Sequence, residues 1–147
     1  MSLSDWQRNG WLIAHLISPQ EIADLLAIVE RDLVNSRVEG LSADWQLNIA
    51  YNAALQAAKA ALAAQGYQVA KGGMAHFHTL QSLTVTVGLS SQDARKLDVF
   101  RKRRNATEYD QAGITSSREA DEMQALASEI RGAVVTWLRA NRPDLLP

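Results

Sequence analysis

The residues best suited to chemistry in this chain lie in one short stretch, Arg101-Lys102-Arg103-Arg104-Asn105-Ala106-Thr107-Glu108-Tyr109-Asp110. Consecutive cations are followed by an amide, a carboxylate and a phenol. Guanidinium groups bind phosphate, and Asn, Glu and Tyr side chains can orient a bound group or move a proton. The stretch therefore predicts a site that binds a phosphate or holds a reacting group in place.

Helical spacing divides these basic residues into two sets. At ~100° per residue, Arg104 lies in line with core-facing apolar side chains, Arg101 lies at the margin of that line, and Lys102 and Arg103 point towards solvent. A charge on the core-facing line needs a partner, and Glu108, one turn later, is a candidate. The alternative interpretation is that Arg104 and Glu108 form only a structural ion pair.

His76 and His78 are the other candidates for proton transfer, because an imidazole titrates near neutrality. Two histidines separated by one residue on a helix point about 200° apart, so they cannot bind one metal ion together. With 3 His and no Cys, the chain is poor in metal ligands. It also lacks a phosphate-binding Gly-rich motif. We therefore predict neither a metal nor a cofactor.

The elements that must position these residues are predicted to be helices throughout. The segment 76–87 is assigned to a helix rather than a strand, because no partner strand is evident. The predicted fold is an all-α, up-and-down bundle of four to five helices in a single domain, residues 1–147, with residues 1–17 as an N-terminal extension. Helix starts are indicated at Ser18, at Ser42, at Ser90 and at Ser116 or Ser117, and helix ends at Gly40, Gly66 and Pro143.

Such a topology would bring the candidates together. Successive helices alternate in direction, so the end of the helix at 42–66, the start of the helix at 76, the end of the helix at 90–109 and the start of the helix at 116 are expected at one pole. This pole would collect the predicted site residues His76, His78, Arg101, Arg104, Asn105, Glu108 and Tyr109.

Composition sets limits on the partners. The formal net charge is -1, so any attraction for nucleic acid must be local rather than a property of the whole surface. No apolar run approaches the ~20 residues of a membrane span, and the N-terminus lacks the regions of a secretory signal. We expect a cytoplasmic protein that does not enter membranes.

Residues 42–140 resemble the HEPN superfamily. The resemblance rests on Asn48-Ile49-Ala50-Tyr51-Asn52-Ala53-Ala54-Leu55, on Gly66-Tyr67, and on Arg104-Asn105 followed by Tyr109 before a turn. Members of that family are small helical bundles, commonly homodimers. Many are toxins of toxin–antitoxin or defence systems that act as metal-independent RNases, and others are partners of minimal nucleotidyltransferases. The family motif is an Arg, a polar residue and then a His, and here Tyr109 stands in the His position.

This difference affects the predicted chemistry. Metal-free RNA cleavage needs a base for the 2′-hydroxyl proton and an acid for the leaving oxygen, and a Tyr with a pKa near ~10 is a poor base at neutral pH. The resemblance implies a degenerate endoribonuclease that binds RNA or nucleotide, with Arg104, Asn105 and Tyr109 catalytic and Arg101, His76, His78 and Glu108 in binding. The alternatives are a non-catalytic homodimer that binds a nucleotidyltransferase or antitoxin, and a bundle with only a structural ion pair.

Overall fold

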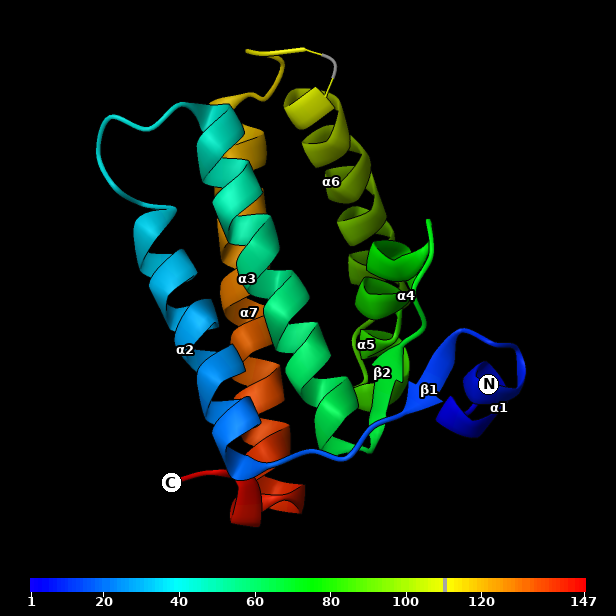
Figure 1. Cartoon of the computed structure of the whole chain (residues 1–147). Helices are drawn as coiled ribbons and strands as arrows, with labels where there is room; N and C mark the ends of the chain where they lie inside the picture. Colours follow the sequence, from blue (N-terminus) through cyan, green and yellow to red (C-terminus); the bar gives the residue numbers. More distant parts are fainter. Residues whose placement is uncertain (110) are drawn as a thin grey trace.

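The computed structural model describes residues 1–109 and 111–147, without the side chains of residues 108 and 109. It is an all-α bundle, as predicted (Figure 1). Within the described ranges, no helix combines the length and the apolar character that crossing a membrane requires. The elements are α1 (Leu3–Arg8), β1 (Leu12–Ala14), α2 (Pro19–Asn35), α3 (Ala43–Ala64), β2 (Tyr67–Val69), α4 (Ala75–Gln81), α5 (Leu83–Thr86), α6 (Ser91–Tyr109), α7 (Ser117–Asn141) and the 3-10 turn η1 (Pro143–Leu145).

Serine caps begin the helices where the sequence predicted. The hydroxyl groups of Ser18, Ser42, Ser90 and Ser116 each accept a hydrogen bond from the backbone N–H three residues later, at 3.1 to 3.3 Å. At α7 the capping box is complete, because Glu119 accepts the Ser116 N–H at 3.1 Å. Each cap satisfies an N–H that has no partner inside the helix, which is typically worth about 1 kcal/mol.

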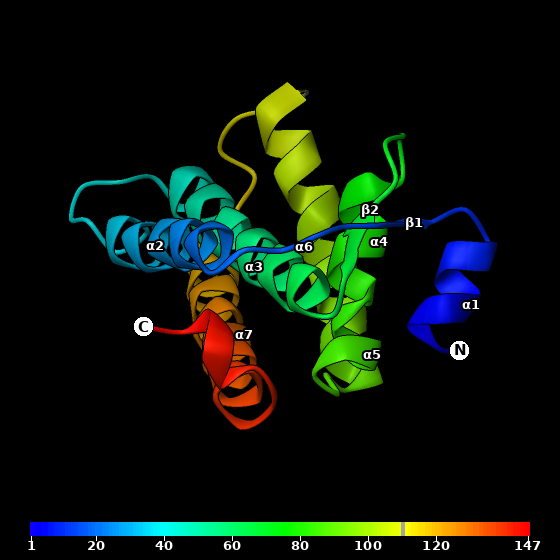
Figure 2. The same cartoon turned by 60° about the horizontal axis from the view of Figure 1, so that its bottom comes forward.

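Helix α3 is the centre of the bundle. It packs against α2 and α7 on one side and against α4 and α6 on the other (Figure 2). Its alanines from Ala50 to Ala64 are between 0 % and 4 % exposed. Their small side chains let neighbouring helices approach closely, while Leu47, Leu55 and Leu62 supply buried volume. An alanine-rich helix that is apolar on nearly all sides is therefore buried on nearly all sides.

A short antiparallel sheet corrects the expectation that no strand would find a partner. In this sheet β1 pairs with β2 in a register that sets Leu12 opposite Val69 and Ala14 opposite Tyr67. Gly66 makes the turn from α3 into β2 with a φ of 93°, a conformation that favours glycine. The sheet fastens the N-terminal extension to the end of α3, which agrees with the burial of Trp6 at 7 % exposed.

Strand β2 also corrects the predicted arrangement at the pole. After α3 ends, β2 carries the chain back along the bundle, so α4 and α5 run in the same sense as α3 rather than against it (Figure 1). The end of α6 and the start of α7 therefore lie beside the start of α3, not beside its end. The predicted helix at 76–87 is helical, as expected, but it consists of two pieces, α4 and α5.

One carboxylate ties the start of α3 to the connection between α6 and α7. Asp44 accepts hydrogen bonds from the backbone N–H groups of Gly113 at 2.5 Å and Thr115 at 3.1 Å. Desolvation opposes its ionisation, but these bonds and the nearby charge of Arg103 outweigh that effect and hold the pKa of Asp44 below its ordinary value. The ionised carboxylate is thus the form that stabilises this end of the bundle.

We expect Asp44→Asn to lower the free energy of unfolding at pH 7 by about 1 to 2 kcal/mol, because an amide accepts these hydrogen bonds less strongly. Since the folded pKa lies below the unfolded value near ~3.9, the contribution is present above that value and is lost as the pH falls through the folded pKa. Urea denaturation should show that the difference in free energy of unfolding between wild type and Asp44→Asn is smaller at pH ~3 than at pH 7. Asp24→Asn, on the exposed side of α2, is the control, and an equal difference at both pH values would contradict the assignment.

Candidate functional site

Arg104 projects from α6 onto a buried aromatic ring of α3. Its guanidinium carbon lies 5.6 Å from the centre of the Tyr51 ring, within the range of a cation–π contact. Its Nη1 donates a hydrogen bond to the Asn105 side-chain oxygen at 3.1 Å. The sequence placed Arg104 on the core-facing line of its helix, and the structure shows it half-buried against α3, with the ring beneath its charge.

The same Tyr51 contacts a histidine of α4. The Tyr51 hydroxyl lies 3.3 Å from Nδ1 of His76, and the two ring centres are 6.1 Å apart. Tyr51 itself is only 1 % exposed. A buried phenol therefore joins a guanidinium and an imidazole that are separated by 28 positions in the sequence, which brings together two of the predicted site residues.

A surface depression of about 220 Å³ opens beside Arg104. Its exposed rim includes Trp45, 59 % exposed, and Arg31, whose side chain is 61 % exposed. A nucleobase can stack on the exposed indole ring while the two neighbouring guanidinium groups bind its phosphates. The remaining lining residues are Asp32, Asn48, Ile49, Tyr51 and Asn52.

Hydrogen bonds between helices hold the polar floor of this depression. Asp32, 6 % exposed, accepts a bond from the Asn52 amide at 2.7 Å and one from Arg31 at 3.0 Å. Asn48 accepts a bond from the Thr107 hydroxyl at 3.2 Å, which joins α3 to α6. Asn52 thus ties α3 to α2. A ligand would therefore meet a floor whose side chains are already held in place.

Arg101 and Arg103 of α6 have their partners outside this depression. Arg101 pairs with Asp98 at 2.8 Å, and its guanidinium carbon lies 5.5 Å from the centre of the Phe77 ring. Arg103 was expected to point into solvent, but it is half-buried and pairs with Glu119 of α7 at 3.0 Å. The connection from α6 brings the first turn of α7 within reach of Arg103 and so supplies this partner, which the helical spacing of α6 alone does not reveal.

His78 lies apart from His76, as their spacing on a helix requires. Its ring stacks on Trp11, with ring centres 4.8 Å apart, and meets Trp6 and Phe77 edge-on at 6.0 and 5.6 Å. Burial among these rings lowers the pKa of the His78 imidazole. The structure thus does not bring His78 to Arg104, and this histidine helps to fasten the N-terminal extension.

Glu108 and Tyr109 close helix α6, and their side chains lie outside the described part of the structure. The predicted catalytic role of Tyr109 and the predicted pairing of Glu108 with Arg104 stay predictions. Among the described residues, the structure groups Arg104 and His76 around Tyr51, with Asn105 bonded to Arg104.

Sequence reasoning did not single out Trp45, Arg31 or Asp32 as site residues. A signal was present for Trp45, because Trp45, Asn48 and Asn52 follow one another at spacings of three and four on α3 and so share one face. The contribution of Arg31 and Asp32 depends on how α2 packs against α3, which is a tertiary property.

Comparison with known protein families and with curated proteins found no relative of this chain: no protein-family model matches it, and no curated protein matches it. Among the residues that the structure describes, no group of three or more His, Asp or Glu side chains is placed to hold a metal ion. The chemical interpretation therefore rests on the side chains around Tyr51.

The lowered pKa of His78 makes a testable contribution to stability. The folded state keeps this imidazole neutral below the unfolded pKa near ~6.5, so protonation favours the unfolded state and stability falls as the pH drops from ~7 towards the folded pKa. We expect His78→Phe, which keeps an aromatic ring but cannot titrate, to lose less thermal stability than wild type between pH 7.5 and 5.5. His15 and His76 are present in both proteins, so the difference reports His78. Parallel losses in the two proteins would refute this account.

Proposed function

We propose that the chain is a HEPN-like domain that binds single-stranded RNA in the depression beside Arg104. The observation that carries this proposal is the exposed indole of Trp45 on the same depression as the guanidinium groups of Arg31 and Arg104. Unpaired bases stack on aromatic rings, and arginines bind the phosphates between them. The chain as a whole has a net charge of -1, so its attraction for RNA must come from a local group of positive charges such as this one.

The arrangement also favours a second candidate, metal-independent cleavage of the bound RNA. In such a reaction the 2′-oxygen attacks phosphorus, the bond to the 5′-oxygen breaks, a base takes the 2′ proton and an acid protonates the leaving oxygen. Arg104 would stabilise the charge that develops on the phosphoryl oxygens. The contact between His76 Nδ1 and the Tyr51 hydroxyl supports this candidate, because it holds an imidazole on the same phenol that Arg104 contacts, in a chain whose motif has Tyr109 in place of the family's histidine.

Other parts of the resemblance stay predictions. They are the homodimer, the toxin–antitoxin or defence role, the nucleotidyltransferase or antitoxin partner, and the cytoplasmic location. The alternative function, a non-catalytic homodimer that binds a partner protein, would use the same face but would not need Trp45 to stack on a base.

For RNA binding, we expect Trp45→Ala and Arg104→Gln each to weaken the affinity for an unstructured RNA oligonucleotide by about tenfold, from the loss of one stacked base or one charge-assisted phosphate contact. Fluorescence anisotropy at several salt concentrations should also show a smaller salt dependence for Arg104→Gln, but not for Trp45→Ala. Arg95→Gln removes an exposed arginine from the same helix and should bind like wild type. Wild-type protein that does not bind at low salt would refute the proposal, as would equal affinity in all four proteins.

For cleavage, purified protein is incubated with labelled RNA in EDTA. If His76 transfers a proton, His76→Gln should slow cleavage by a factor on the order of 10² to 10⁴, and Arg104→Gln by a factor on the order of 10². Lys96→Gln, on the exposed side of α6, should cleave like wild type. Equal rates in all proteins would indicate a contaminating nuclease. RNA that is bound but left intact by wild type would remove the catalytic candidate and leave the binding function standing.

A further inference from the structure

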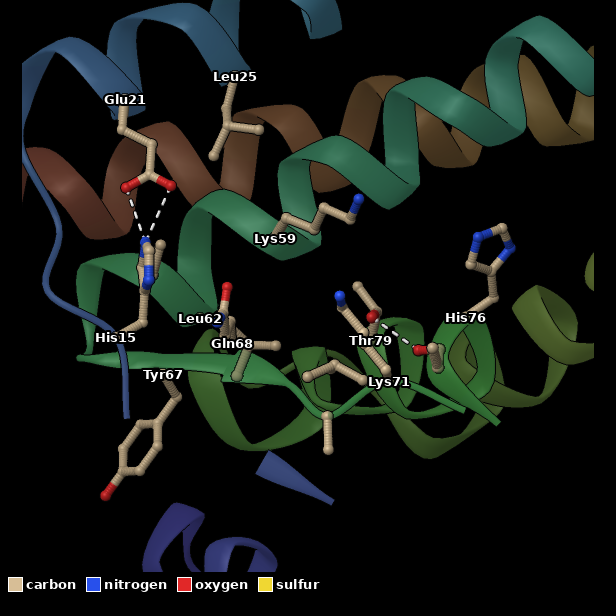
Figure 3. A pocket seen from close by; sticks show the side chains of 14 residues that line it. His15, Glu21, Leu25, Lys59, Leu62, Tyr67, Gln68, Lys71, His76 and Thr79 are labelled. Carbon is tan, nitrogen blue, oxygen red and sulfur yellow. Dashed lines mark hydrogen bonds and ion pairs between the residues drawn. The ribbon is translucent and has the colours of Figure 1, made fainter. Parts of the chain in front are cut away.

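A second, larger cavity of about 420 Å³ lies on the side of α3 that faces β2 and the start of α4 (Figure 3). Its floor is closed by Leu62 and Thr79, which are 1 % and 2 % exposed. Figure 3 shows His15 and Glu21 towards one end and His76 towards the other, with Lys59 projecting from α3. A volume of this size accommodates a small organic molecule.

The charges that line this cavity do not cancel. Glu21 is the acid of the cavity, and both of its oxygens contact Nε2 of His15, at 2.8 and 2.9 Å. Lys59 and Lys71 also line the cavity, and in the described part of the chain neither has a carboxylate within ion-pair distance. With Glu21 paired, two ammonium groups leave the cavity with an excess of positive charge.

Lys59 is exposed although the residues on either side of it in the sequence are buried. It is the one charged residue between Asp44 and Lys71 in the sequence. Its neighbours Ala58 and Ala60 are both 0 % exposed, so α3 is otherwise covered by packing at this point. The interruption of a buried alanine-rich surface by a lysine coincides with the cavity, which therefore has an apolar floor and a cationic wall.

We infer that this cavity binds a phosphate monoester attached to an organic group of nucleoside size. A phosphate monoester carries a charge of about −1.5 to −2 at neutral pH, which balances the charge of two lysines. A ligand with a single carboxylate would balance only one of them. Phosphate alone is much smaller than the cavity, and Leu25 and Leu62 offer apolar contacts to an attached ring. This inference does not rest on the RNA site proposed beside Arg104, since it concerns a different cavity. His76 lines this cavity and also contacts Tyr51, which lines the depression beside Arg104.

The same chemistry has two sources, a free nucleotide and the 5′-phosphorylated end of an RNA. Isothermal titration with each of the four nucleoside monophosphates, with inorganic phosphate and with adenosine tests the first. Comparing oligonucleotides that differ only in a 5′-phosphate or a 5′-hydroxyl tests the second. We expect at least one phosphate monoester to bind more tightly than phosphate or adenosine alone.

Substitution and NMR locate the binding. Lys59→Gln and Lys71→Gln should each weaken phosphate monoester binding by about tenfold, the effect of one charge-assisted hydrogen bond. Lys96→Gln is the matched control and should leave it unchanged. The ligand should shift the imidazole signals of His15 and His76 more than that of His78, which is enclosed by Trp6 and Trp11. Thermal melting of each variant confirms that it is folded.

The outcomes separate the two proposals. If a 5′-phosphate raises the affinity for an oligonucleotide, and Lys59→Gln abolishes this gain while Arg104→Gln leaves it intact, the ligand is the end of an RNA. If only a free phosphate monoester binds tightly, the ligand is a nucleotide. The inference is overturned if no phosphate monoester binds and the 5′-phosphate gives no benefit. It is equally overturned if the two lysine variants bind like wild type. Neither result bears on the affinity that depends on Trp45 and Arg104.

Discussion

The burial of α3 on nearly all of its sides is the constraint on which the rest of the structure depends. Its alanines remove the side-chain bulk that would keep α2, α7, α4 and α6 apart, so the neighbouring backbones close around it. A polar side chain that is buried on such a helix needs a hydrogen-bonding partner. Asn52 bonds to Asp32 of α2, Asn48 to Thr107 of α6, and Tyr51 contacts His76 of α4. The polar side chains that form the candidate site are thus also those that fix how α3 meets its neighbours.

Tyr51 shows how one buried side chain can assemble a site from distant parts of the sequence. Its ring face lies under the Arg104 guanidinium, and its hydroxyl reaches His76. A phenol suits this position because its ring is apolar enough for the core while its hydroxyl needs a polar partner. The cation above the ring is only half-buried, so it keeps contact with solvent, where an anion could approach. An arginine and a histidine that contact the same phenol are held in fixed relation without any metal.

Local signals allowed most of the helices to be predicted, because a serine cap or a terminal glycine acts within a few residues. The core-facing position of Arg104 likewise follows from helical spacing alone. The pairing of β1 with β2 was not predictable, since each strand has three residues and more than fifty residues separate them. That pairing accompanies the reversal that placed the end of α6 beside the start of α3, so the predicted meeting of the end of α3 with the end of α6 was wrong. Arg104 and His76 nevertheless come together at Tyr51. The partner of Arg103 and the depression rimmed by Trp45 likewise depend on how helices pack, and the spacing within one helix does not specify that packing.

His76 gives the two polar spaces a common element. It lines the cavity that contains Lys59 and Lys71, and its Nδ1 faces the phenol beneath Arg104. The ring therefore lies between the two spaces, and a ligand that moved it in the cavity would also break its contact with the phenol beneath Arg104.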